Sequence, residues 1–296
     1  MAQMNRKTRA DRIFDVVNIT FLSLLLIAVI YPLIFVISAS FSEPLRVLQG
    51  EVWLLPKGLN VEGYKLVFSH DQILTGYRNT IFYTLLGTSI NLIMTILGAY
   101  PLSRRDFRGR SFFSVLFLFT MFFSGGLIPT YLVMKQLGLV NTIWALVIPG
   151  AVSVWNLTIM RNFFQTSIPF ELQESAMIDG CGNMALLWRI VLPLSTPIIA
   201  VMVMFYGVGH WNAFFNALIY LSDEKKYPLQ LVLRSILIQE QTNEMIAADD
   251  SAIRRQMMAE IIKYAGIVIA SIPVLMLYPF LQKYFVHGIM VGAIKG

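Results

Sequence analysis

Four charged residues gather in one short part of an otherwise apolar region: Glu171, Glu174, Asp179 and Arg189. A helix with so many charges is costly to place in the hydrocarbon of a bilayer, so this segment must lie at the membrane surface or in water. The sequence has no cluster of metal ligands and no G-x-x-x-x-G-K-[ST] phosphate loop. We therefore expect no catalytic residue, no metal and no cofactor bound by this chain.

A second set of polar and aromatic side chains lies inside a long apolar run: Tyr206, His210, Trp211, Asn212 and Asn216. Tyr206 and His210 are four residues apart, and Asn212, Asn216 and Tyr220 continue at this spacing, which places each set on one helical face. Polar groups at membrane depth are costly unless they meet partners or a water-filled cavity. They therefore either line a path through the membrane or bond and pack between helices, including helices of a partner chain.

The composition predicts an integral membrane protein of the all-α class, because 56% of the 296 residues are apolar and only 14% are charged. The apolar runs are continuous rather than alternating, which favours helices over a barrel. We expect a single transmembrane domain, residues 1–296, whose first helix is uncleaved. Long intervals without charge predict six transmembrane helices, near residues 16–40, 80–102, 111–134, 142–164, 194–221 and 261–284.

The basic residues predict the orientation of these helices. Arg6, Lys7, Arg9 and Arg12 precede the first span, and Arg104, Arg105, Arg108 and Arg110 follow the second. By the positive-inside rule both clusters are cytoplasmic, which places both termini and segment 165–193 in the cytoplasm and makes 222–260 an external loop. A cluster in so short a loop has no recognition element beside it, so we expect no nucleic-acid partner. Gly125, Gly126 and Pro129 predict a kink in the third span.

The polar segment carries a pattern with fixed spacing. Glu174, Ser175 and Ala176 are followed by three residues, then Gly180, then nine residues and I-x-L-P, which contains Ile190, Leu192 and Pro193. This resembles the EAA loop of ATP-binding-cassette (ABC) importer permeases, with Ser175 in place of the first alanine. The resemblance implies a type I importer fold and a cytoplasmic coupling helix, with Asp179 also in the coupling set. Glu174 would face polar or basic groups of an ATPase, and Ala176 would allow its close approach. The alternative is a plain interfacial connector.

Three further stretches resemble the carbohydrate-uptake permeases, similar to the smaller membrane subunit of the maltose importer: W-N-A-F-F-N-A-L-I-Y from Trp211, K-Y-P-L-Q-L from Lys226, and the final V-G-A-I-K-G. The resemblance implies oligosaccharide import across the cell membrane of a bacterium or archaeon, in contact with membrane lipid. It implies a second homologous permease, two ATPase subunits that hold ATP and Mg, and an extracellular solute-binding protein. The chain alone would be no enzyme.

The same resemblance implies that Gly292, Lys295 and Gly296 lie against the ATPase dimer, where the alternative is a frayed end on the membrane. It also implies that the 222–260 loop reaches into the binding protein, rather than being a solvated connector. The polar set at Tyr206–Asn216 suits a sugar path, because amide, imidazole and aromatic groups all bind sugars. Two other functions remain open: an importer of the same architecture for another solute, or a secondary transporter, which should carry acidic residues inside its spans.

Overall fold

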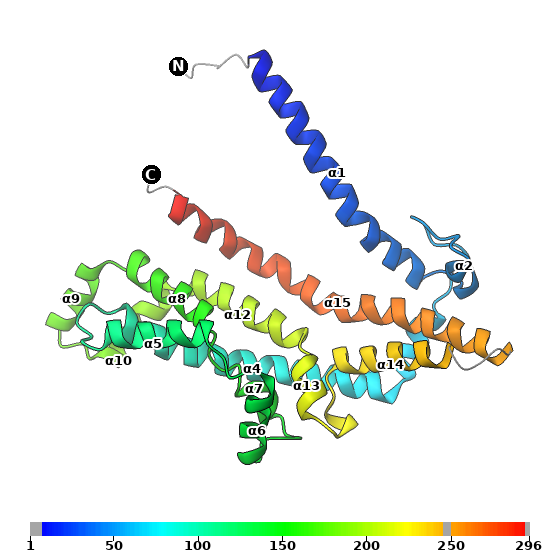
Figure 1. Ribbon diagram of the computed structural model, residues 1–296. Helices are drawn as coiled ribbons and strands as arrows, with labels where there is room; N and C mark the ends of the chain where they lie inside the picture. The colour runs from blue at the N-terminus through cyan, green and yellow to red at the C-terminus, as the bar shows by residue number, and fades with distance from the viewer. Residues whose placement is uncertain (1–7, 245–249, 294–296) are drawn as a thin grey trace. The chain divides into compact units, whose positions relative to one another are not determined.

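The computed structural model describes residues 8–244 and 250–293 of the chain (Figure 1). Within these ranges the regular elements are helices and no strand is present, which confirms the all-α class. A π-helical turn at Leu187–Val191 and a 3₁₀ turn at Glu224–Lys226 join some of them. The α-helices are α1 (Arg9–Ser40), α2 (Pro44–Leu48), α3 (Glu62–Ser69), α4 (Asp71–Ser103), α5 (Arg110–Phe122), α6 (Leu127–Gln136), α7 (Trp144–Val147), α8 (Val154–Ser167), α9 (Phe170–Ile178), α10 (Asn183–Leu186), α11 (Leu192–Leu194), α12 (Thr196–Trp211), α13 (Phe215–Tyr220), α14 (Leu229–Glu244) and α15 (Asp250–Ala293).

Three of the described helices are long and apolar enough to cross a membrane: α1, α4 and the Ala259–Leu277 part of α15. Two helix pairs reach the same length only together. α5 and α6 are bent by 112°, and Asn183–Leu194 and α12 are bent by 83°. The break between α5 and α6 contains Gly125 and Gly126, where the sequence predicts a kink, and Gly126 has a φ of 86°.

One stretch differs from its sequence interpretation. The predicted fourth span, 142–164, is interrupted, because α7 and α8 are separated by a non-helical stretch that contains Pro149 and Gly150. Within the predicted external loop, 222–260, the sequence favours helical patches near 229–239 and 251–262, and the structure has α14 and the beginning of α15 there.

The chain divides into two compact units, and each is described here by itself. The first unit is Met1–His70 with Ser235–Ala270. In it the end of α1 packs on α3, where the hydroxyls of Ser40 and Tyr64 lie 2.8 Å apart. The Phe35 and Tyr264 rings meet edge to face at 5.8 Å, which joins α1 to α15.

The second unit, Asp71–Arg234 with Ser271–Gly296, is built around α4, which packs against α8 and α12. Small and polar residues form much of the buried face of α4, including Gly76, Thr80, Gly87, Asn91, Thr95 and Ala99. Small residues let two helix backbones approach closely. At Gly87 the approach is so close that an added Cβ would lie 2.5 Å from the His210 ring of α12.

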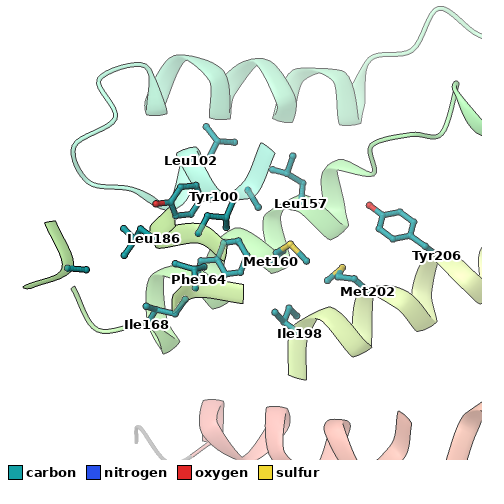
Figure 2. Packing of buried hydrophobic residues seen from close by; sticks show 14 residues of the cluster. Tyr100, Leu102, Leu157, Met160, Phe164, Ile168, Leu186, Ile198, Met202 and Tyr206 are labelled. Carbon is teal, nitrogen blue, oxygen red and sulfur yellow. The ribbon is translucent and has the colours of Figure 1, made fainter. Parts of the chain in front are cut away.

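The apolar core of this unit lies where α4, α8, α10 and α12 meet. Figure 2 shows Met160 and Phe164 of α8 among side chains from the other helices. Met160 and Phe164 are almost fully buried, as are Leu186 of α10 and Met202 of α12. The core therefore joins the polar segment around Glu174 to the long helices, since Ala176 of α9 belongs to the same cluster.

Candidate functional site

The polar segment folds into a short helix, α9, with defined ends. Pro169 stands before its first residue and keeps Ile168 extended, which separates α9 from α8. At the other end Gly180 has a φ of 78°, the left-handed conformation that glycine adopts at little cost. The Gly180 N–H donates to the Met177 carbonyl at 3.0 Å and the Cys181 N–H to the Ala176 carbonyl at 2.9 Å. These are the two bonds of a Schellman cap, so Gly180 turns the chain back after α9.

The two faces of α9 differ in exposure. Its inner face, Gln173 and Ala176, is buried against the rest of the unit. Its exposed face, Glu171, Glu174, Ser175 and Ile178, is open, and Ile178 is 86% exposed. The small side chain of Ala176 lets α9 pack closely on its own core. The close approach of an ATPase at this residue stays a prediction.

Arg104, at the end of α4, holds the inner face of α9. Its guanidinium donates to both Asp106 carboxylate oxygens, at 2.9 and 2.8 Å, and to Gln173 Oε1 at 3.0 Å. The hydrogen bonds from Arg104 lower the pKa of the Asp106 carboxyl below its ordinary value. The stabilisation from this pair is therefore present at neutral pH and is lost only as the pH falls through the lowered pKa. Next to it, the Arg105 guanidinium lies 4.8 Å from the centre of the Phe170 ring.

Sequence reasoning missed this arrangement, because it used Arg104 only as a charge that sets orientation. Gln173 gave no signal beyond its place three residues before Ala176, which puts both on one helical face. Asp106, two residues after the arginine, was the available hint, since a carboxylate so close is a natural ion-pair partner.

The I-x-L-P residues lie at the end of a second short helical stretch, Asn183–Leu194. Ile190 and Leu192 are half-buried and Pro193 is exposed. The long helix α12 begins at Thr196, after the 83° bend at Ser195. Pro193 therefore stands just before the bend that leads into α12, next to residue 194, where the fifth span is predicted to begin. The π-helical turn at Leu187–Val191 widens this stretch.

Tyr206 and His210 bond α12 to its neighbours. The Tyr206 hydroxyl lies 2.7 Å from Thr95 Oγ1 of α4, and both groups are buried. His210 Nε2 lies 2.6 Å from Asn91 Oδ1, so this nitrogen carries the proton and donates it to the amide oxygen. These contacts favour the helix-bonding alternative for both residues. Trp211 is buried, with its ring edge to face with Tyr77 at 5.6 Å.

Asn212, Asn216 and Tyr220 do not share one continuous helix. The helix ends at Trp211 and the next one, α13, begins at Phe215, so the expected single helical face is interrupted. The Asn212 amide donates to the Val208 carbonyl at 3.0 Å, and both asparagines are exposed. Beside them the Arg234 guanidinium lies 5.0 Å from the centre of the Phe214 ring. This break is the most polar exposed part of the predicted substrate path.

The residues of the predicted C-terminal contact lie where the described part of the chain ends. Gly292 belongs to the last turn of α15, and Lys295 and Gly296 lie outside the described residues.

Replacing Tyr206 with Phe should lower stability modestly. The change removes the bond to Thr95 and leaves a buried hydroxyl unpaired, a cost of about 1–3 kcal/mol. Y206F and T95V should both lower the thermal unfolding temperature of the purified protein. Solute uptake should fall only in proportion to the loss of folded protein. A large loss of uptake in Y206F at unchanged stability would instead place the hydroxyl in the substrate path.

Comparison with known proteins identifies the class of this protein. Residues 73–291 match the family described as the binding-protein-dependent transport system inner membrane component, and the chain belongs to this family. The match confirms the predicted resemblance to ABC importer permeases and their all-helical membrane fold.

Individual relatives are similar over nearly the whole chain. Protein LplC of Bacillus subtilis (strain 168) is 45% identical over 290 residues, which cover 98% of this chain and 97% of that protein. The polygalacturonan/rhamnogalacturonan transport system permease protein YtcP of the same organism is 42% identical over 291 residues, 97% of this chain and 99% of that one. A crystal structure of a bacterial ABC transporter involved in the import of the acidic polysaccharide alginate has a TM-score of 0.86 and 34% identity, and covers 95% of this chain and 100% of that chain.

Proposed function

We propose that this chain is the membrane permease subunit of an ATP-driven oligosaccharide importer and that α9 couples it to a separate ATPase. The observation that carries the proposal is the two-sided character of α9. Its inner face is fixed to the core, whereas Glu174 and Ile178 on its exposed face bind nothing in the described chain. A rigid helix with an acidic and apolar exposed face suits docking into a groove of a soluble partner.

The coupling set in this proposal has distinct parts. Glu174 and Ser175 contact the ATPase, with Asp179 at the end of the same helix. Gly180 fixes the turn that follows α9. The second short helical stretch contains Ile190, Leu192 and Pro193. It transmits a displacement of the segment to α12 across the bend at Ser195. The C-terminal residues Gly292, Lys295 and Gly296 provide a second ATPase contact.

The substrate in this proposal is an oligosaccharide, and oligosaccharides that contain uronic acids are the first choice. Two of the three relatives described above are named for transport of acidic polymers, polygalacturonan and alginate. On this chain the break between α12 and α13 offers the exposed amides of Asn212 and Asn216, and Arg234 supplies a positive charge beside them. Amide and guanidinium groups are good partners for sugar hydroxyls and carboxylates.

The proposal needs several partners. A second homologous permease completes the path, two ATPase subunits bind ATP and Mg, and an extracellular solute-binding protein delivers the sugar. The chain itself is no enzyme. Helix α1 exposes apolar side chains over nearly its whole length, which suits contact with lipid or with the second permease.

Uptake by the reconstituted complex tests the substrate class. We expect ATP-dependent uptake of labelled galacturonate or alginate oligosaccharides, weaker uptake of neutral malto-oligosaccharides, and none of amino acids. Preferred uptake of neutral oligosaccharides would refute the acidic class and leave the sugar importer standing. Uptake of amino acids alone would refute the sugar assignment.

A further inference from the structure

The end of α4 is joined to α9 by one nearly buried charged side chain. Arg104 is only 5% exposed, although it follows the last residue of a long helix and lies in a cluster of arginines. Its partner Gln173 is 69 residues away in the sequence and is also buried. An arginine whose charge served only orientation would remain in water, because burying it is costly without partners.

The guanidinium uses its separate donors for separate tasks. Nε and one terminal nitrogen hold the two oxygens of Asp106, which neutralises the charge locally. The other terminal nitrogen donates to Gln173. The terminal nitrogen that binds Asp106 also lies 3.3 Å from the Met177 sulfur. Only the planar fork of arginine can serve the carboxylate and α9 together, since a lysine ammonium is a compact point charge.

A half-open pocket of about 400 Å³ lies beside this contact, bordered by Tyr100, Arg104, Asp106 and Asn183. The Tyr100 hydroxyl donates to the Asn183 carbonyl at 3.2 Å. The polar contacts therefore form a second connection between α4 and the polar segment, beside the apolar core that also joins them.

We propose that Arg104 is a positioning residue that transmits displacement of α9 to α4. This rests on the proposed function, in which an ATPase moves α9. Because α8 and α12 pack on α4, a force that reaches the end of α4 acts on the helix at the centre of the unit. The position of Arg104 at the junction, rather than contact with either ATPase or sugar, gives it this role.

The test compares substitutions in the complete importer reconstituted in lipid nanodiscs. R104Q removes the charge and the fork, R104K keeps the charge alone, and Q173A removes the α9 partner while the Arg104–Asp106 pair persists. R108Q is the matched control, because Arg108 is an exposed arginine of the same loop. The readouts are the amount of assembled complex, ATP hydrolysis with and without sugar-loaded binding protein, and sugar imported per ATP.

We expect stimulation of ATP hydrolysis by the loaded binding protein to fall about tenfold in R104Q, the order expected from losing a hydrogen bond to a charged group. R104K should resemble R104Q, Q173A should fall less, and R108Q should behave as the unaltered complex. Sugar imported per ATP should fall in the same order, which a loss of folded protein would not produce.

Normal stimulation in R104Q, or in Q173A if R104Q does not assemble, would overturn the inference. The outcome for Glu174 separates the two claims. If E174K abolishes stimulation and Q173A and R104Q do not change it, the coupling role of α9 stands and the role of Arg104 falls. If E174K also has no effect, the proposed function of α9 itself fails.

Discussion

Substituting Glu174 with Lys should reduce sugar uptake by about 100-fold, the order of effect seen when one member of a buried interfacial charge pair is lost. Glu174 lies on the exposed face of α9 and makes no hydrogen bond or ion pair within the described chain. The change therefore costs the fold little, within about 0.5 kcal/mol. Its effect should fall on the contact with the ATPase, where the charge is reversed. Uptake into proteoliposomes and ATP hydrolysis stimulated by the binding protein measure it.

The matched control for this prediction is E62K. Glu62 is also an exposed glutamate on a helix, α3, outside the polar segment. E62K should assemble and transport normally, which shows that one added cation is not harmful by itself. Normal transport by E174K would mean that α9 is the plain interfacial connector that the sequence left open.

Substituting Gly87 with Ala should destabilise the protein by about 1–3 kcal/mol, the usual cost of overpacking. The new Cβ would lie 2.5 Å from the His210 ring. The ring cannot simply swing away, because Nε2 is bonded to Asn91, whose amide bonds to the Gly150 carbonyl. The expected measurement is a lower thermal unfolding temperature and less assembled complex.

Two further variants make the Gly87 prediction specific. G209A adds the same methyl group to α12, where no atom lies within 4 Å, and should be neutral or slightly stabilising. H210A removes the obstructing ring, so G87A should cost little when added to it. A double-mutant cycle with no coupling between Gly87 and His210 would contradict the close α4–α12 contact.

The features that the sequence predicted correctly depend on local rules. Continuous apolar length predicts the long helices α1 and α4, which are both long and apolar enough to cross a membrane. Gly125 and Gly126 predict the break between α5 and α6. Each of these follows from residues that are close together in the chain.

The features that it missed depend on contacts between distant residues. The bond from Arg104 to Gln173 spans 69 positions, and no hydropathy pattern reports it. The 83° bend at Ser195 and the end of α12 at Trp211 interrupt an apolar run that reads as one span. Periodicity also placed Asn212, Asn216 and Tyr220 on one helical face, but a helical face lasts only as long as the helix, and α12 ends before Asn212.

ATP-dependent uptake is the most direct test of the central claim. Proteoliposomes that contain this chain, its partner permease and the ATPase would be loaded with ATP and given a labelled oligosaccharide outside. We expect accumulation only when internal ATP and the external solute-binding protein are both present, and its loss in E174K. Accumulation by this chain alone, driven by an ion gradient without ATP, would contradict the account and identify a secondary transporter.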